Sequence, residues 1–193
     1  MTPAPQSLNP EQRTALLSIA RRAIRDRVYG RSVSQSSPTD PALQDPGAAF
    51  VTLTRDGALR GCIGYVYALR PLAEAVAHCA ASAATGDPRF PPVTNRELSD
   101  LQVEISVLSP LRRVRDPDEI QIGVHGLHIS KDGHHGLLLP QVATEFGWDR
   151  ETFLRQVCVK AGLPQDAWRR GADVQIFTVE RVEDGRPVGT EDA

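Results

Sequence analysis

Residues 49–66, AFVTLTRDGALRGCIGYV, give the clearest indication of the fold in this chain. Apolar and polar residues alternate on both sides of Asp56-Gly57, a pair that suits a two-residue type I′ turn. The pattern predicts an antiparallel hairpin, with one strand over residues 49–55 and a return strand over residues 58–66. A hairpin at this place excludes a purely parallel sheet.

The predicted turn also sets a register between the two strands. Leu53 then faces Arg60, and Val51 faces Cys62, so that Arg60 and Cys62 share one face of the sheet. Because a neighbouring cation stabilises a thiolate, Arg60 would make Cys62 a better nucleophile or redox group. The alternative is that Cys62 is a small buried hydrophobe in a twisted strand, as free cysteines often are.

Two glycines, Gly61 and Gly64, lie on either side of Cys62. Glycine weakens a strand by about 0.5–1 kcal/mol relative to alanine. Its presence in a strand therefore indicates a β-bulge or the close approach of a ligand or another backbone. For this reason we take Cys62 as the centre of the predicted site.

Helices and further strands are predicted on both sides of the hairpin. The first helix is predicted to begin at an N-cap, a first-turn proline and a capping-box residue, which are Asn9, Pro10 and Gln12. Gly30 is expected to end it. Residues 31–47 have no periodicity and are expected to form a long loop. The other predicted elements are helices beginning at Pro71, Thr94 and Asp149, and strands over residues 102–108, 127–131, 134–139 and 174–182. This order predicts a mixed α+β domain with one curved, largely antiparallel sheet and helices packed on it.

Composition excludes several classes of protein. The chain has 193 residues and a formal net charge of −2, without the basic excess of most proteins that bind nucleic acid or anionic lipid. No apolar run approaches the roughly 18 residues that span a membrane, and residues 1–8 lack the features of a signal peptide. We therefore expect a cytoplasmic protein that binds neither membrane nor nucleic acid. One basic cluster is interpreted as the solvated face of the first helix: Arg21, Arg22, Arg25, Arg27 and Arg31.

The three cysteines, Cys62, Cys79 and Cys158, are far apart and show no CxxC spacing. A disulfide framework or a cysteine-based zinc or iron–sulfur site is therefore not expected, and all three should be free thiols. Cys79 and Cys158 fall on the apolar stripes of predicted helices, which indicates structural roles.

Four histidines, His125, His128, His134 and His135, fall within eleven residues. The hairpin predicted there places His128 and His135 on one face and the other two at opposite ends of the other face. A single metal centre cannot use all four, so no metal site is expected. His125 lies between two glycines at a strand boundary, where it can serve as a base or orienting group for Cys62.

Four further polar residues are candidates for a site. Glu104 alternates away from the apolar face of its strand, which solvent exposure and function explain equally well. Asp87 and Arg89 lie in a proline-rich segment that they could hold together through an ion pair. Gln141 follows a very apolar strand and could direct its amide at a ligand or satisfy loop backbone.

Several motifs together resemble the AMMECR-domain family, whose bacterial and archaeal members are called AmmeMemoRadiSam system protein A. LRGCIG at residues 59–64 is similar to the hallmark of that family. The other motifs occur in the family's order: FVTL at 50–53, DPRFPP at 87–92, VEISVLSP at 103–110, GVHGL at 123–127, LLPQV at 138–142 and CVKAGL at 158–163. The resemblance covers about residues 10–182.

The resemblance implies an α+β fold with a barrel-like sheet and internal duplication. The domain over residues 9–182 would be single or divided into two halves near residues 110–120, with flexible tails at residues 1–8 and 183–193. Family members are associated with a Memo-type protein and a radical-SAM enzyme, which implies a shared modification pathway. The cluster and SAM would belong to that enzyme, so no cofactor is expected in this chain.

Carried over to this sequence, the resemblance implies a site made of Arg60, Cys62, Asp87, Arg89, Glu104, His125 and Gln141. Two hypotheses stay open. In the first, the protein is a cysteine-dependent enzyme for a small polar substrate: Cys62, Glu104 and His125 are catalytic, and the other four residues bind the substrate. In the second, it is a non-catalytic module that binds a substrate or docks the radical-SAM partner, with its glycines fitting another chain's backbone.

Overall fold

The computed structural model describes residues 7–33 and 40–183. The chain divides into two compact units. The first contains residues 1–108 and 180–193, and the second contains residues 109–179.

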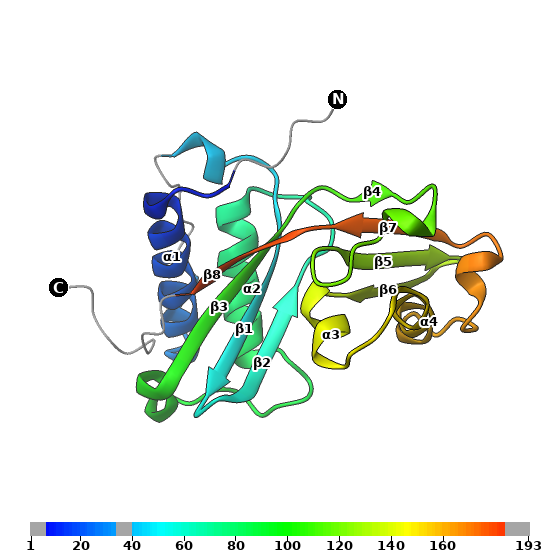
Figure 1. Ribbon diagram of the computed structural model, residues 1–193. Helices are drawn as coiled ribbons and strands as arrows, with labels where there is room; N and C mark the ends of the chain where they lie inside the picture. The colour runs from blue at the N-terminus through cyan, green and yellow to red at the C-terminus, as the bar shows by residue number, and fades with distance from the viewer. Residues whose placement is uncertain (1–6, 34–39, 184–193) are drawn as a thin grey trace. The chain divides into compact units, whose positions relative to one another are not determined.

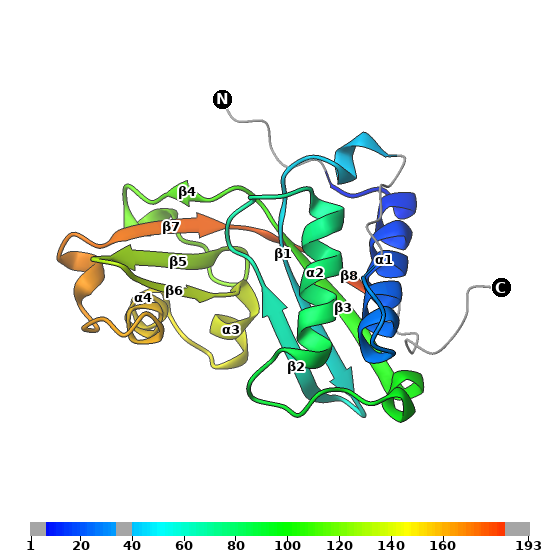
Figure 2. The same cartoon turned by 180° about the vertical axis from the view of Figure 1, so that it is seen from behind.

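The first unit is a four-stranded sheet with two helices on one face, as the two opposite views in Figures 1 and 2 show. Its strands lie in the order β2-β1-β3-β8, and β1 pairs antiparallel with both β2 and β3. The bounds are α1 Pro10–Val28, η1 Pro41–Leu43, β1 Ala48–Arg55, β2 Ala58–Gly64, α2 Leu72–Thr85, η2 Asn95–Asp100, β3 Leu101–Leu108 and β8 Val179–Glu183, where η marks a 3-10 helix.

The second unit is a smaller sheet in the order β4-β7-β5-β6, and its named pairings are antiparallel. Its separate core is centred on Leu127, Ile129 and Phe153, none of which is exposed to solvent. The bounds are β4 Arg112–Arg113, η3 Pro117–Glu119, β5 Gly126–Lys131, β6 His134–Leu138, α3 Pro140–Glu145, α4 Arg150–Lys160, η4 Ala167–Arg169 and β7 Asp173–Phe177.

The predicted helix ends are largely confirmed. Asn9 and Gln12 form the reciprocal capping box of α1, with bonds of 2.8 and 2.9 Å. Asp149 caps α4 through the backbone N–H of Thr152 at 2.8 Å. Gly86 ends α2 as predicted, although that helix begins one residue later than expected. These ends follow from contacts within a few residues, which explains why sequence patterns locate them.

Both predicted hairpins turn as expected. The central residues of the first turn, Asp56 and Gly57, have φ of 52° and 77°. Those of the second turn, Asp132 and Gly133, have φ of 49° and 82°. Positive φ at both positions identifies type I′ geometry, whose twist matches that of the flanking strands.

The predicted register of the first hairpin is wrong beyond its second pair. A bulge leaves Arg60 without a partner on β1, so Cys62 lies opposite Thr52 rather than Val51. Val51 is part of the core beneath the helices. The shift of one residue therefore moves Cys62 from the helix-covered face of the sheet to the opposite face.

The two glycines explain this bulge by contacts within the chain. A Cβ added at Gly61 would lie 2.2 Å from the carbonyl oxygen of Ala83 in α2, so β2 can approach that helix only with glycine at this position. A Cβ at Gly64 would meet the ring of Phe50 at 2.2 Å on the other face. The glycine-flanked pattern thus reflects a bulge and a close backbone approach, both inside the first unit.

The prediction of an α+β fold is confirmed, but the single barrel-like sheet is not observed. The described strands form two open sheets. The strand predicted over residues 174–182 is divided at Thr178 between β7 and β8, which belong to different sheets. Thr178 exchanges hydrogen bonds with Ser109 instead: its carbonyl accepts at 3.0 Å, and its N–H donates to the serine hydroxyl at 2.9 Å.

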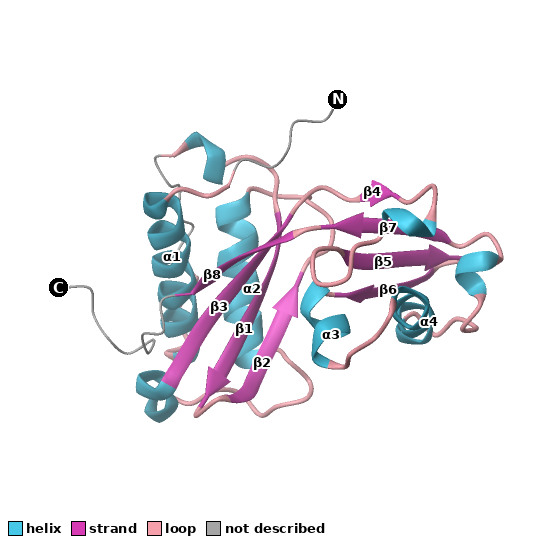
Figure 3. Ribbon diagram, viewed as in Figure 1, coloured by secondary structure: helices cyan, strands magenta, loops and turns pink. Residues whose placement is uncertain are grey.

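Some segments differ from expectation in detail. Residues 41–43 of the predicted loop form η1, whose Leu43 is fully buried, whereas residues 34–39 lie outside the described part. Leu8, within the predicted tail 1–8, donates its N–H to Glu180 at 3.1 Å; residues 1–6 and 184–193 lie outside the described part. Helix α3, which follows β6 in Figure 3, had no counterpart in the sequence interpretation.

Candidate functional site

A row of polar side chains crosses the first unit's sheet on the face opposite α1 and α2. Cys62 on β2 pairs with Thr52 on β1, and Thr52 pairs in turn with Glu104 on β3. Side chains at paired positions point to the same face, so all three project together. The hydroxyl of Thr52 donates a hydrogen bond to the sulfur of Cys62 at 3.4 Å. The half-buried thiol therefore has a hydrogen-bond donor fixed beside it.

Glu104 forms the other end of this row. One carboxylate oxygen is bound by the guanidinium of Arg181 on β8, and the other accepts from the hydroxyl of Ser106 at 3.4 Å. Its side chain is 21% exposed. Solvent exposure alone therefore does not explain why this glutamate alternates away from the apolar face.

Asp87 and Arg89 hold the backbone at Cys62 from both sides. The Asp87 carboxylate accepts from the backbone N–H of Cys62 at 2.9 Å and from the guanidinium of Arg89 at 2.6 and 2.9 Å. Arg89 also donates to the carbonyl oxygen of Cys62 at 3.3 Å. The predicted ion pair is present, and it ties the proline-rich segment to β2. We call this arrangement, in which Asp87 and Arg89 bind the backbone of Cys62, the Asp87 clamp.

The charge of Asp87 is stabilised in this position. Its side chain is 2% exposed, and burial alone would raise the pKa of the carboxyl group. The hydrogen bond from Arg89 outweighs that penalty, and the backbone N–H groups of Cys62 and Arg89 add to it, so the pKa of Asp87 is lowered. Asp87 is therefore a buried anion that positions Cys62.

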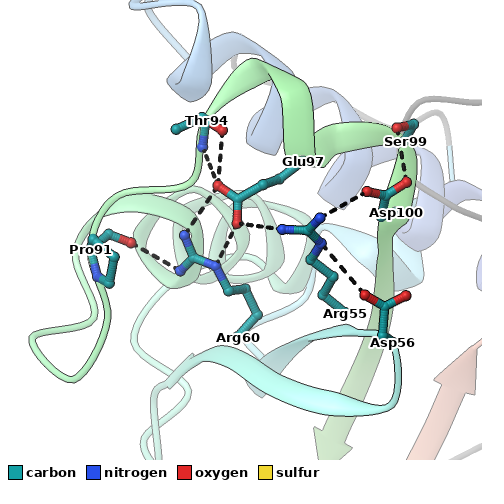
Figure 4. A network of polar contacts seen from close by, with 8 residues as sticks. All are labelled: Arg55, Asp56, Arg60, Pro91, Thr94, Glu97, Ser99 and Asp100. Atoms are coloured by element: carbon teal, nitrogen blue, oxygen red, sulfur yellow. Dashed lines mark hydrogen bonds and ion pairs between the residues drawn. The ribbon is translucent and has the colours of Figure 1, made fainter.

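Arg60 is bound to Glu97 and to the backbone of Pro91, as Figure 4 shows. Its guanidinium donates to both carboxylate oxygens of Glu97, at 2.8 and 3.3 Å, and to the carbonyl oxygen of Pro91 at 2.9 Å. Glu97 also accepts from the backbone N–H of Thr94 at 2.8 Å. Arg60 thus anchors the start of η2 to the hairpin, and its role in binding a substrate stays a prediction.

Glu97 should make the protein sensitive to acid. The hydrogen bond from Arg60 is the main cause that lowers the pKa of Glu97 from 4.5 to about 2. A carboxyl group whose pKa is lower in the folded state stabilises the protein fully above its unfolded value. That contribution is lost as the pH falls from 4.5 towards about 2. We expect Glu97→Gln to be destabilising at neutral pH and to flatten this acid dependence, measured by urea unfolding at several pH values.

The control for this measurement is Glu151→Gln, because Glu151 on α4 is an exposed partner of Arg155 and Arg169. Exposed pairs contribute little to stability. The Glu97 prediction is contradicted when both variants show the same pH dependence as the unaltered protein.

His125 and Gln141 belong to the second unit. The Nδ1 atom of His125 accepts from the backbone N–H of Gln121 at 3.1 Å, so its proton is on Nε2 in the neutral form. Burial first, and then the charge of Arg112, lowers the pKa of His125. Gln141 is the second residue of α3. Cooperation of either residue with Cys62 stays a prediction.

Cys79 and Cys158 have the structural positions expected of them. Both are fully buried in cores, and all three cysteines are free. Burial raises the pKa of the Cys79 thiol to about 12 and also raises the pKa of Cys158. These two thiols are therefore poor nucleophiles near neutral pH.

His128 and His135 share a face of the second sheet as predicted, with stacked rings whose centroids are 6.0 Å apart. Within residues 7–33 and 40–183, no group of three or more His, Cys, Asp or Glu side chains is arranged to hold a metal ion. In the same part of the chain, none of the helices has the length and apolar character needed to cross a membrane.

Thr52, Ser106 and Arg181 were not singled out from the sequence. Strand alternation alone places Ser106 on the same face as Glu104, whereas Thr52 shares that face only once the pairing of β1 with β3 is known. Arg181 lies far along the chain on β8 and reaches Glu104 through tertiary pairing. No local signal in the sequence points to Arg181.

Comparison with known proteins identifies relatives over most of the chain. A sequence model of the AMMECR1 family matches residues 17–182. A protein from Thermococcus onnurineus is 45% identical over 186 residues, covering 90% of this chain and 91% of the relative. A protein from Methanothermobacter thermautotrophicus is 46% identical over 169 residues, covering 83% and 88%. The crystal structure of the uncharacterized protein PH0010 from Pyrococcus horikoshii is similar, with a TM-score of 0.83, 42% identity and coverage of 91% and 92%.

Proposed function

The chain belongs to the AMMECR1 family, and on this premise we propose that it is a cysteine-dependent enzyme for a small polar substrate. Cys62 is the nucleophile or redox thiol of the proposed site. The enzyme acts in a modification pathway together with a Memo-type protein and a radical-SAM enzyme. The family's hallmark residues 59–64, which contain Cys62, support this assignment.

The row Cys62–Thr52–Glu104 is the observation that carries the proposal. Neighbouring strands lie about 4.8 Å apart, so the thiol and the carboxylate are separated by roughly 10 Å across the sheet. A small substrate lying over Thr52 would meet the sulfur at one end. At the other end it would meet Glu104 and the guanidinium of Arg181, an arrangement that suits polar groups on the substrate.

The proposed reaction begins with the Cys62 thiolate, which is stabilised by the donated hydrogen bond from Thr52. Its sulfur forms a bond to an electrophilic carbon of the substrate, while the electron pair of the broken bond departs with the leaving group. The thiol proton passes to solvent water when the thiolate forms, because the Glu104 carboxylate lies at the far end of the row, roughly 10 Å from the sulfur. The Asp87 clamp keeps the cysteine backbone fixed during this step.

The non-catalytic docking hypothesis has less support. It explained Gly61 and Gly64 by the approach of another chain's backbone. The space beside each glycine is already occupied by atoms of the first unit: the carbonyl oxygen of Ala83 at Gly61 and the ring of Phe50 at Gly64. The thiol with its hydrogen-bond donor has no comparable packing explanation, which favours the enzyme.

Loss of the thiol should abolish function without unfolding the protein. We expect Cys62→Ala and Cys62→Ser to fail to restore the pathway in cells that lack the wild-type gene, with unfolding transitions close to that of the parent. Cells lacking the Memo-type or the radical-SAM protein should show the same defect. Full restoration by Cys62→Ala would exclude covalent or redox catalysis by this residue.

Alkylation of the native protein, resolved by peptide mass, tests the state of the thiol directly. Cys62 should react, whereas Cys79 and Cys158 should not, because they are buried. Thr52→Val should slow alkylation of Cys62 by about tenfold, since a hydrogen bond to a charged group contributes about 1.5–3 kcal/mol. Thr54→Val is the matched control, two residues along the same strand. Equal rates in the two variants would remove Thr52 from the proposed site.

A further inference from the structure

A groove of about 520 Å³ lies in the first unit, between the last turns of α1 and the 3-10 helix η2. Figures 1 and 2 both show η2 beside the C-terminal end of α1. The volume falls within the range of small-molecule sites, about 300–1,000 Å³. Residues that line it include Arg22, Arg25, Asp26 and Tyr29 from α1 and its end, and Asn95 and Ser99 from η2.

The groove is cationic although the whole chain has a net charge of −2. Three arginines line it, Arg31 being the third, against the single acidic residue Asp26. Arg13 and Arg60 elsewhere in this unit are paired with carboxylates. The side chain of Arg25, in contrast, has neither an ion pair nor a hydrogen bond with any described residue. Its guanidinium is available to an anion.

An aromatic ring lies at the same groove. Tyr29 is 52% exposed, which is high for so large a side chain. The guanidinium of Arg31 lies 5.3 Å from the centroid of its ring. Exposed aromatic rings beside cationic side chains are the arrangement on which bases of nucleotides stack. Asn95 adds amide donors across the groove.

The position of Arg25 has one simpler explanation. Arg25 and Arg27 both lie in the last turn of α1, where cations complement the negative end of the helix. That effect applies to both arginines equally. Only Arg25 of the two lines the groove, so the two residues separate helix stabilisation from ligand binding.

We propose that this groove binds a nucleoside diphosphate. The phosphates are held at Arg25 and the neighbouring arginines, and the base stacks on Tyr29. Anions of this kind carry the two features to which the groove is complementary, a multiple negative charge and a planar ring. The inference does not depend on the reaction at Cys62, because it concerns different residues on α1 and η2.

Isothermal titration calorimetry of the full chain with ADP tests the proposal, at an ionic strength of about 150 mM so that unspecific attraction is screened. Saturable binding is expected with a Kd no weaker than about 1 mM. Arg25→Gln should weaken binding by about tenfold, the effect of one charge-assisted hydrogen bond. Arg27→Gln removes the same charge from the same turn and should change the Kd less than about twofold.

Pyrophosphate serves as the second probe and tests the role of the ring. Tyr29→Ala should weaken ADP binding by about tenfold, since stacking of a base contributes about 1–3 kcal/mol, and should leave pyrophosphate binding unchanged. Three results would each overturn the proposal: no saturable binding of ADP, equal losses in Arg25→Gln and Arg27→Gln, or pyrophosphate binding as tight as ADP. None of these results bears on Cys62.

Discussion

Replacement of Gly61 by alanine is expected to lower the free energy of unfolding by about 2–4 kcal/mol. The new methyl group would lie 2.2 Å from the carbonyl oxygen of Ala83 and 3.1 Å from its carbonyl carbon. Both are backbone atoms of α2, which packs against the core between the helices and the sheet and therefore cannot shift locally. The strand and the helix must therefore separate, and chemical denaturation would measure the loss.

Gly64 provides the matched control for this substitution on the same strand. Its added methyl group would also meet atoms at 2.2 Å, but these belong to the side chain of Phe50. A ring can change its rotamer, so Gly64→Ala should cost less, and the double variant Gly64→Ala/Phe50→Ala should remove the clash altogether. If Gly61→Ala were as stable as the parent, the close approach of β2 and α2 would be wrong.

Replacement of Asp87 by asparagine is the second change with a large expected effect, about 2–4 kcal/mol at neutral pH. The variant loses the charge that pairs with Arg89 at 2.6 Å. The backbone N–H groups of Cys62 and Arg89 donate to different oxygens of the carboxylate, at 2.9 and 3.1 Å, and the variant replaces one of these two acceptors by an amide nitrogen that only donates. We expect lower stability together with faster, less selective alkylation of Cys62, because its backbone is no longer fixed.

The dependence of this effect on pH follows from the direction of the shift. The pKa of Asp87 is lowered in the folded protein, chiefly by the hydrogen bond from Arg89. Its stabilising contribution is therefore complete above the unfolded pKa of 3.8 and declines as the pH falls below that value. The difference in the free energy of unfolding between the parent and Asp87→Asn should therefore become smaller as the pH falls.

Asp118→Asn is the control for Asp87→Asn, since Asp118 is 83% exposed and also pairs with an arginine, Arg150. It should unfold like the parent at every pH, because exposed ion pairs contribute little. A constant difference between parent and Asp87→Asn down to low pH would show that the charge of Asp87 is not what stabilises the clamp.

Parts of the candidate site could be read from sequence because they are single residues in unusual local contexts. Cys62 lies between glycines, and Asp87 and Arg89 lie among prolines that exclude regular structure. Glu104 is a charged residue on the polar face of an alternating strand. The sequence could not show what these residues contact. The clamp joins positions 25 residues apart, and the ion pair of Arg181 with Glu104 joins positions 77 apart.

Patterns in the sequence were enough to predict the two type I′ hairpins, the capped ends of α1 and α4 and the α+β class, and the order of its motifs indicated the family. The hairpins, the helix ends and the fold class depend on φ preferences, hydrogen bonds or alternation within a few neighbouring residues. The folded structure was needed to show that the sheet is divided at Thr178 and that a bulge at Arg60 moves Cys62 to the face opposite the helices. The bulge depends on the close approach of α2 to Gly61, and the division depends on which distant strand each half pairs with. Contacts of this kind leave no periodicity in the chain, because their partners are set by packing rather than by neighbours in sequence.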